Sequence, residues 1–218
     1  MKMKIKRYRP RDWTVHPPYL YEHYRSTPLR SPRKPLIPLI QTLSELTGPV
    51  YGHDAVHPGD SDLTTNAGRG GQAIGERIIV TGRVLEEDGR PVPNALVEVW
   101  QANAAGRYPH KRDQHDAPHD PNFTGAGRCT TNEKGEYQFI SIKPGAYPWG
   151  NHYNAWRPSH IHYSLFGYAF VTRLVTQMYF PGDPLLPLDP IYNGIPDEKA
   201  RQRLIAKFAH DVCDPGRA

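Results

Sequence analysis

Proline and glycine interrupt this chain so often that only short elements of regular structure can form. The 218 residues include 23 prolines and 19 glycines. Together they are about a fifth of the chain, whereas they make up roughly 12% of an average protein. Neither residue follows a repeat, and aromatic side chains are plentiful, so the excess does not indicate disorder. The composition predicts a mainly β protein that is rich in turns.

The first 75 residues are expected to form an extended arm and loops. Seven prolines between positions 10 and 38 prevent long helices and strands there. One short helix is expected over Leu39–Leu46, ended by Gly48 and Pro49. The glycine-rich run 68–71 lacks the lysine and the hydroxyl residue of a phosphate-binding loop, so we assign it no nucleotide role.

Positive charge is concentrated in this arm. Residues 1–34 carry ten Lys or Arg and two acidic residues, while the remainder carries 17 basic and 20 acidic residues. Nucleic-acid binding is one interpretation of such an arm. No nucleic-acid-binding module follows it, however, so we expect no nucleic-acid partner. We favour a solvated tail, or one that wraps a partner subunit.

From residue 76 the pattern changes to short strands, which predict a β-sandwich that occupies residues 76–218 as a single catalytic core. A capping Asp197 predicts a helix from Glu198 to about His210, with Ala200, Leu204 and Phe208 on its packing face. Two hairpins are expected, the first joining the third and fourth strands across the turn 132–135 and the second joining the last two. The expected strands are Arg77–Leu85, Ala95–Gln101, Gly127–Thr131, Glu136–Ile142, His160–Phe166 and Phe170–Met178.

Membrane insertion and secretion find no support in the sequence. Mean hydropathy is −0.67, and no apolar run is long enough for a membrane helix. The basic N-terminus is not followed by the apolar stretch of a signal peptide. Two cysteines, Cys129 and Cys213, are too few for a disulfide framework. We therefore expect a cytoplasmic protein without a membrane partner.

A His-x-His pair lies in the strand that begins at residue 160. Residues i and i+2 of a strand point to the same face, about 6.6 Å apart, so His160 and His162 can converge on one metal ion. Ile161 would point into the core. Alone, such a pair is a weak signal, because two histidines packed in a core or at a surface are more common.

Two tyrosines strengthen the interpretation. Tyr108 and Tyr147 each lie beside proline and glycine in a stiff loop. A free phenol has a pKa near 10 and binds metal poorly at neutral pH unless a strong Lewis acid displaces its proton. Phenolate oxygen with imidazole nitrogen suits Fe(III) better than Zn(II), which prefers Cys, His and carboxylates. Two tyrosines and two histidines are therefore a candidate ligand set for one ferric ion per chain.

The segment 110–120 is a competing candidate, since it holds three histidines and three aspartates. Their spacing fits no common zinc pattern, and nearby prolines favour an exposed loop. We interpret this segment as a polar loop at the rim of the site.

Taken together, these motifs resemble the intradiol ring-cleavage dioxygenases, most closely the β chains of the members that cleave protocatechuate. The resemblance covers nearly the whole chain and does not depart from the family at any ligand position. It is carried by Arg83–Leu85, Asn94–Asn103, Gly106–Tyr108, Gly145–Trp149, Arg157–His162 and Tyr179–Pro184, and it includes Gly48 and Pro49.

The resemblance implies a function and roles for individual residues. Fe(III), held by Tyr108, Tyr147, His160 and His162, would support cleavage of protocatechuate by O2, giving 3-carboxy-cis,cis-muconate without an external reductant. Tyr147 would also serve as a base, and Arg157 would stabilise negative charge. A related α chain would complete a hetero-oligomer. Weaker candidates for contacts with the aromatic diol are Tyr24, Trp149, Gln177 and Ile191.

Two alternatives remain open. The first is the same chemistry on catechol or hydroxyquinol. The second is a metal-free, transthyretin-like structural β-sandwich, which iron content distinguishes from an enzyme. A non-catalytic subunit is disfavoured, because such a subunit is expected to lack the ligands. The cation that would bind the carboxylate of protocatechuate cannot be placed from the sequence.

Overall fold

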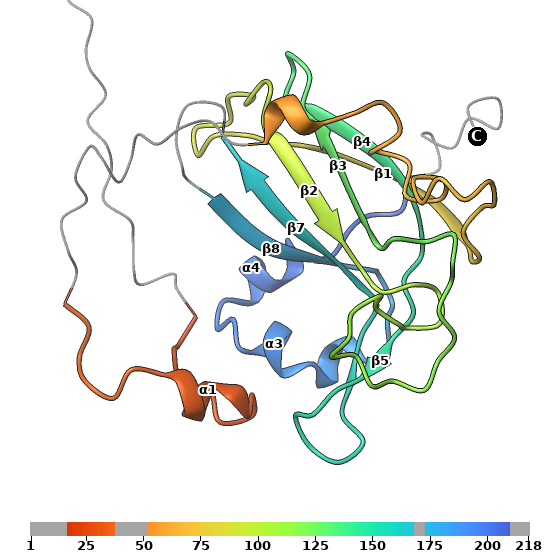
Figure 1. The fold of residues 1–218 in the computed structure, drawn as a ribbon. Helices are drawn as coiled ribbons and strands as arrows, with labels where there is room; N and C mark the ends of the chain where they lie inside the picture. Colours follow the sequence, from red (N-terminus) through yellow and green to blue (C-terminus); the bar gives the residue numbers. More distant parts are fainter. Residues whose placement is uncertain (1–16, 38–51, 168–172, 210–218) are drawn as a thin grey trace, which may run out of the picture.

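The fold is built from two antiparallel β-sheets, in a computed structural model that describes residues 17–37, 52–167 and 173–209. The smaller sheet pairs β1 (Arg77–Arg83) with β4 (Glu136–Ile142). The larger sheet has the order β3-β2-β7-β8 (Figure 1). Its strands are β2 (Leu96–Trp100), β3 (Ala126–Thr130), β7 (His160–Phe166) and β8 (Arg173–Tyr179).

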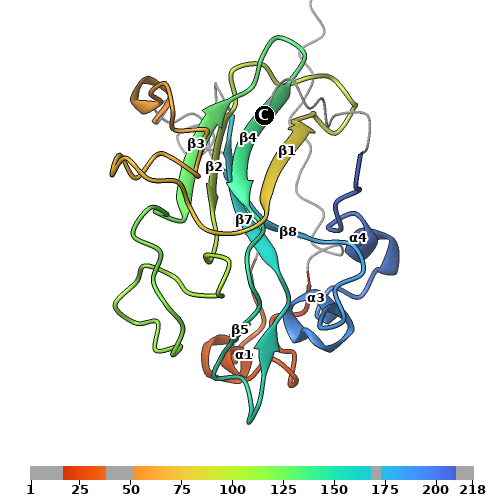
Figure 2. The same cartoon turned by 90° about the vertical axis from the view of Figure 1, so that its right-hand side faces the viewer.

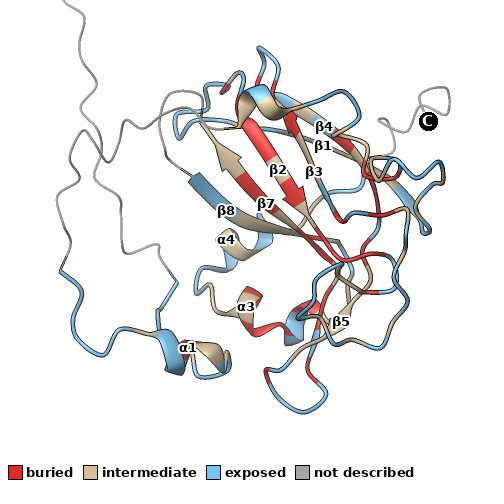
Figure 3. Ribbon diagram, in the orientation of Figure 1, coloured by how far each residue is buried: buried red, intermediate tan, exposed pale blue. Residues whose placement is uncertain are grey.

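Figure 2 shows the two sheets facing each other from the side, and the main core is formed by side chains of both. Residues of both sheets contribute to one apolar cluster, including Val97 and Val99 of β2, Phe139 of β4 and Ile161 of β7. The middle strands β2 and β7 are the most completely buried (Figure 3). The prediction of a mainly β sandwich with short helices is confirmed, and so is the inward position of Ile161.

Several short elements lie outside the two main sheets. One of them is a two-stranded ribbon, β5 (Tyr147–Pro148) with β6 (Trp156–Arg157). Within the described ranges the helices are all brief, as the proline content predicts. They are α1 (Ser26–Arg30), α3 (Pro190–Asn193) and α4 (Glu198–Gln202), with 3-10 turns η2 (His53–Ala55) and η3 (Leu186–Leu188).

One predicted hairpin is correct and the other is wrong. Strands β7 and β8 pair as expected; β7 has the predicted bounds, and β8, described from Arg173, ends at Tyr179, one residue beyond the predicted end at Met178. The strands on either side of the turn 132–135 do not pair, because β3 joins β2 and β4 joins β1 in the opposite sheet. The turn itself forms, with the Gly135 N–H donating to the Asn132 carbonyl. It therefore connects the two layers of the sandwich, as many connections in β-sandwiches do.

The predicted C-terminal helix begins correctly but is much shorter than expected. The Asp197 side chain accepts a hydrogen bond from the Lys199 N–H and caps α4, which ends at Gln202. Beyond it, the backbone pairs with the end of β8, where the Tyr179 N–H donates to the Leu204 carbonyl. These bonds to β8 replace those of a longer helix. Phe208, expected on the packing face, is 70% exposed.

Several predictions concern the N-terminal region. The helix expected over Leu39–Leu46 lies outside the described residues, as do residues 1–16 of the basic arm. Part of the expected loop region packs onto the sandwich, since Leu63 is fully buried in the main core. The division at residues 75 and 76 stays a prediction. No helix within the described ranges has the length and apolar character needed to cross a membrane.

Candidate metal centre and substrate pocket

The two histidines lie on β7 next to the edge strand β8, on the face opposite Ile161. Strand register places His160 opposite Tyr179 and His162 opposite Gln177. The two imidazole rings are 4.8 Å apart between centroids. The prediction that both rings share one face of a strand therefore agrees with the sheet geometry.

His160 presents a lone pair to the site. Its Nδ1 lies 2.6 Å from the Pro158 carbonyl oxygen, which can only accept, so Nδ1 carries the proton. The unprotonated Nε2 lies 3.4 Å from the Tyr147 hydroxyl. Burial, reinforced by the charge of Arg157, lowers the pKa of His160 to about 3, so the ring is neutral. A buried neutral imidazole fixed through its far nitrogen is typical of metal ligands.

His162 is held by neighbours on both sides of its strand. The Trp100 ring stacks on the His162 ring, with centroids 4.8 Å apart and an interplanar angle of 3°. On the other side, Gln177 Nε2 lies 3.3 Å from His162 Nδ1. Burial lowers the pKa of His162 to about 4, so this ring is also neutral. For His162 Nε2 to offer a lone pair to a metal, Nδ1 must carry the proton, and the Gln177 amide must flip so that its oxygen faces Nδ1. Such a flip exchanges the amide oxygen and nitrogen and barely changes the shape of the side chain.

The two tyrosine loops meet through their glycines. Gly106, at φ +77°, packs so closely on the Ala146 carbonyl that a Cβ would collide with it. Gly145 approaches Ala104 in the same way, and its N–H donates to the Asn103 carbonyl at 2.9 Å. The glycine in each motif thus allows two backbones to touch. This contact brings Tyr108 and Tyr147 together, with ring centroids 5.3 Å apart.

The His- and Asp-rich loop 110–120 supports Tyr108. Asp113 accepts a hydrogen bond from the Tyr108 N–H at 2.7 Å, and Asn103 donates to the Pro118 carbonyl at 3.0 Å. Within the described part of the chain, no three His, Cys, Asp or Glu side chains gather as metal ligands would. The zinc interpretation of this loop therefore has no structural support, whereas its contact with the candidate site is direct.

The four predicted ligands converge from three separate segments of the chain. Tyr108 contacts the rings of Tyr147 and His162, and Tyr147 contacts His160. The Tyr108 hydroxyl is buried, and no described residue forms a hydrogen bond with it. Burial raises the pKa of both phenols, most strongly at Tyr108. A buried phenol without a hydrogen-bond partner beside two neutral imidazoles is a donor set that a ferric ion would complete, so these residues fit ferric iron.

Arg157 places a buried positive charge beside these residues. It lies on β6 directly opposite Tyr147 of β5, and it is only 3% exposed. Its charge lowers the pKa of both histidines and opposes the burial that raises the pKa of Tyr147. It also opposes the burial that raises the pKa of Tyr108, so Arg157 acts electrostatically on all four candidate ligands.

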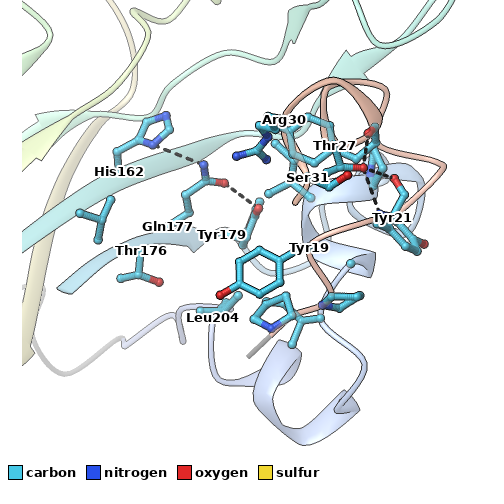
Figure 4. Close-up of a pocket in the computed structure, with 18 residues that line it drawn as sticks. Tyr19, Tyr21, Thr27, Arg30, Ser31, His162, Thr176, Gln177, Tyr179 and Leu204 are labelled. Carbon is cyan, nitrogen blue, oxygen red and sulfur yellow. Dashed lines mark hydrogen bonds between the residues drawn. The ribbon is translucent and has the colours of Figure 1, made fainter. Parts of the chain in front are cut away.

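A cavity of about 460 Å³ opens beside His162, between the arm and β8 (Figure 4). Three of the four predicted substrate contacts line it: Tyr24, Gln177 and Ile191. The fourth, Trp149, is not part of the lining, but its ring lies 5.5 Å from that of Tyr24 and also 5.5 Å from the Arg157 guanidinium carbon. Trp149 thus connects the pocket wall to Arg157.

The arm is fastened to this pocket. Asn151, which is buried, accepts a hydrogen bond from the Arg25 N–H and donates one to the His23 carbonyl, both at 2.8 Å. Sequence reasoning missed Arg30, which lines the cavity from the arm, and Asp189, which pairs with Arg157. No motif surrounds Arg30, and the Asp189-Pro190 pair signals only the start of a helix.

Comparison with known proteins identifies the family. A family model described as Dioxygenase matches residues 46–217, and a model described as protocatechuate 3,4-dioxygenase beta subunit N terminal matches residues 9–42. The protocatechuate 3,4-dioxygenase beta chain of Burkholderia cepacia is 63% identical over 209 residues, which cover 96% of this chain and 88% of that protein. The chain belongs to the intradiol ring-cleavage dioxygenase family.

Other intradiol dioxygenases are more distant. The hydroxyquinol 1,2-dioxygenase of a Rhizobium strain is 35% identical over 66% of this chain and 48% of its own length. The solved catechol 1,2-dioxygenase of Acinetobacter sp. ADP1 matches with a TM-score of 0.51 and 26% identity, over 72% of this chain and 51% of that one. The chain spans about half the length of these two relatives. Membership of the intradiol family implies the use of iron.

Proposed function

We propose that this chain cleaves protocatechuate between its two hydroxyl-bearing carbons with dioxygen, giving 3-carboxy-cis,cis-muconate, as the β subunit of an α/β assembly. The observation that carries this proposal is the convergence of Tyr108, Tyr147, His160 and His162 beside a pocket that His162 helps to line. The similarity to the Burkholderia cepacia β chain supports both the substrate and the α-chain partner. The match to the β-subunit N-terminal model supports the same partner.

The same four residues would hold one ferric ion. Fe(III), when bound, supplies a Lewis acid that stabilises phenolates and activates an aromatic diol towards dioxygen. The protein supplies two phenols, two neutral imidazoles and a nearby fixed positive charge. The unpartnered Tyr108 hydroxyl and the proton on His160 Nδ1 support these assignments.

Tyr147 is the residue we assign as proton acceptor. Burial raises the pKa of its phenol above the ordinary value of about 10, so a free phenolate at this position takes up a proton readily. Its hydroxyl lies beside His160 on one side, and its strand pairs with Arg157 on the other. Tyr147 would thus receive a proton from the diol as the substrate binds.

Arg157 would stabilise the negative charge that develops on the ring. Its guanidinium is buried, held in place and permanently charged. A preorganised charge in a site sheltered from water stabilises the negative charge of a transition state more than the same charge does in solution. In the pocket, Gln177 and Ile191 contribute the β8 and α3 walls, and Tyr24 contributes the arm wall.

Arg30 is our candidate for binding the substrate carboxylate. It lines the pocket, and its guanidinium carbon lies 5.1 Å from the centre of the Tyr24 ring. Arg30→Gln should raise the KM for protocatechuate about tenfold, because a charge-assisted hydrogen bond is lost. The KM for catechol, which has no carboxylate, should not change. Steady-state kinetics with both diols measure this difference.

Arg25→Gln is the matched control, since Arg25 lies on the same arm but does not line the pocket. It should leave both KM values unchanged. Equal losses for protocatechuate and catechol in Arg30→Gln would show that Arg30 does not recognise the carboxylate.

The proposed function is tested by oxygen uptake and product analysis. The chain, co-expressed with its α partner, is given protocatechuate, catechol and hydroxyquinol. We expect one oxygen molecule consumed per protocatechuate, with 3-carboxy-cis,cis-muconate as product. Preference for another diol would correct the substrate, and no turnover of any diol by an iron-replete complex would contradict the proposal.

A further inference from the structure

Asp189 joins the start of helix α3 to the buried guanidinium of Arg157. Its carboxylate is fully buried. Oδ1 accepts a hydrogen bond from the Ile191 N–H at 3.0 Å and caps α3. Oδ2 accepts from Arg157 Nε at 3.3 Å and Nη2 at 3.1 Å. One side chain therefore positions both a pocket wall and the charge beside the candidate ligands.

Of the groups that accept hydrogen bonds from Arg157, only Asp189 has a fixed polarity. Gln177 Oε1 accepts at 2.7 Å and the Tyr179 hydroxyl at 3.3 Å. An amide can turn over and a hydroxyl can rotate, so each can present a donor instead. A carboxylate in an ion pair only accepts. Its negative charge also compensates a guanidinium that would otherwise be buried unpaired.

These contacts involve only one edge of the Arg157 guanidinium, the edge formed by Nε and Nη2. Asp189, Gln177 and Tyr179 bind Nε and Nη2. The guanidinium also acts on Tyr147, whose pKa it lowers through its charge and a side-chain hydrogen bond, against the effect of burial. Since Arg157 lies opposite Tyr147 in the β5–β6 ribbon, the position of the guanidinium depends on the anchor behind it.

We propose that Asp189 is a positioning residue that fixes the Arg157 guanidinium in its catalytic orientation while it caps α3. This inference rests on the proposed function, because it assigns Arg157 a role in that reaction. The carboxylate does not touch the substrate. It acts through Arg157, and through α3 it keeps Ile191 in the pocket wall.

Asp189→Asn tests this role in the co-expressed complex. Asparagine caps helices as well as aspartate does, so α3 should persist, while the charge and one acceptor are lost. We expect kcat for protocatechuate to fall about tenfold, the equivalent of one charged hydrogen bond. KM should change little, because the pocket wall is retained.

A double-mutant cycle with Arg157→Met tests whether Asp189 acts through Arg157. In the Arg157→Met variant, Asp189 is a buried charge without a counterion, so Asp189→Asn should raise the melting temperature. In the wild-type chain, where the ion pair is present, the same substitution should lower the melting temperature. The effect on kcat should likewise vanish when Arg157 is absent. Melting temperature and kcat thus give independent measurements of the same contact.

Asp197→Asn is the control, since Asp197 caps α4 in the same manner, accepting from the Lys199 N–H at 2.8 Å. It should leave kcat unchanged. A normal kcat in Asp189→Asn, or an equal loss with and without Arg157, would overturn the inference. A wild-type complex that turns over no diol would instead overturn the proposed function, and this role with it.

Discussion

Tyr147→Phe should retain iron but lose most of its activity. The other three candidate ligands remain, so the iron content should stay near that of the wild type. The phenolate that would accept a proton from the diol is gone, and kcat should fall by about 10²–10⁴-fold, the usual contribution of a positioned base. Elemental analysis and steady-state kinetics on the same preparation measure both quantities.

Tyr153→Phe provides the control for this variant. Tyr153 belongs to the connection between β5 and β6, close to Tyr147 in sequence, and is 98% exposed. Its substitution should change neither iron content nor kcat. Wild-type turnover by Tyr147→Phe would remove this residue from the mechanism.

Tyr108→Phe should affect iron binding and stability in opposite directions. The Tyr108 hydroxyl is buried without a hydrogen-bond partner among the described residues. Its removal should raise the free energy of unfolding of the iron-free protein by about 1 kcal/mol, because a buried polar group without a partner is destabilising. The same change should strongly reduce iron binding. A gain in stability together with a loss of iron is characteristic of a ligand and not of a structural tyrosine.

Chemical denaturation of iron-free protein and metal titration measure the two effects. Tyr163→Phe is the control, since its hydroxyl donates to Met178 Sδ within the core. That variant should bind iron normally and gain no stability. If Tyr108→Phe were destabilised and still bound iron at the wild-type level, the ligand assignment of Tyr108 would be wrong.

The sequence allowed the elements that carry the histidines to be predicted closely. The pair of segments on either side of Gly167 predicted a strand over His160–Phe166, with the two histidines on one face and Ile161 inward, and the structure has β7 with these bounds. This success has a simple cause, because the two faces of a strand differ in polarity whenever one face is buried. The turn 132–135 was also recognised, but turn residues do not determine which sheet the next strand joins, and so the pairing of β3 with β4 was predicted wrongly.

The rest of the site depends on contacts between segments far apart in the chain. Arg30 reaches the pocket because Asn151 fastens the arm, 126 positions away from Arg25. Asp189 meets Arg157 across 32 positions. A sequence pattern reports local geometry, so the motifs of the candidate ligands could be recognised, whereas the residues that hold or complement them became visible only in the fold.

The central claim is that two tyrosines and two histidines bind ferric iron, and a visible absorption spectrum tests it most directly. The purified α/β complex, with its iron content measured, is examined before and after anaerobic addition of protocatechuate. We predict one iron per β chain and a tyrosinate-to-Fe(III) charge-transfer band that shifts when the diol is added. A colourless protein that takes up no iron when iron is supplied would contradict the claim and favour a metal-free β-sandwich.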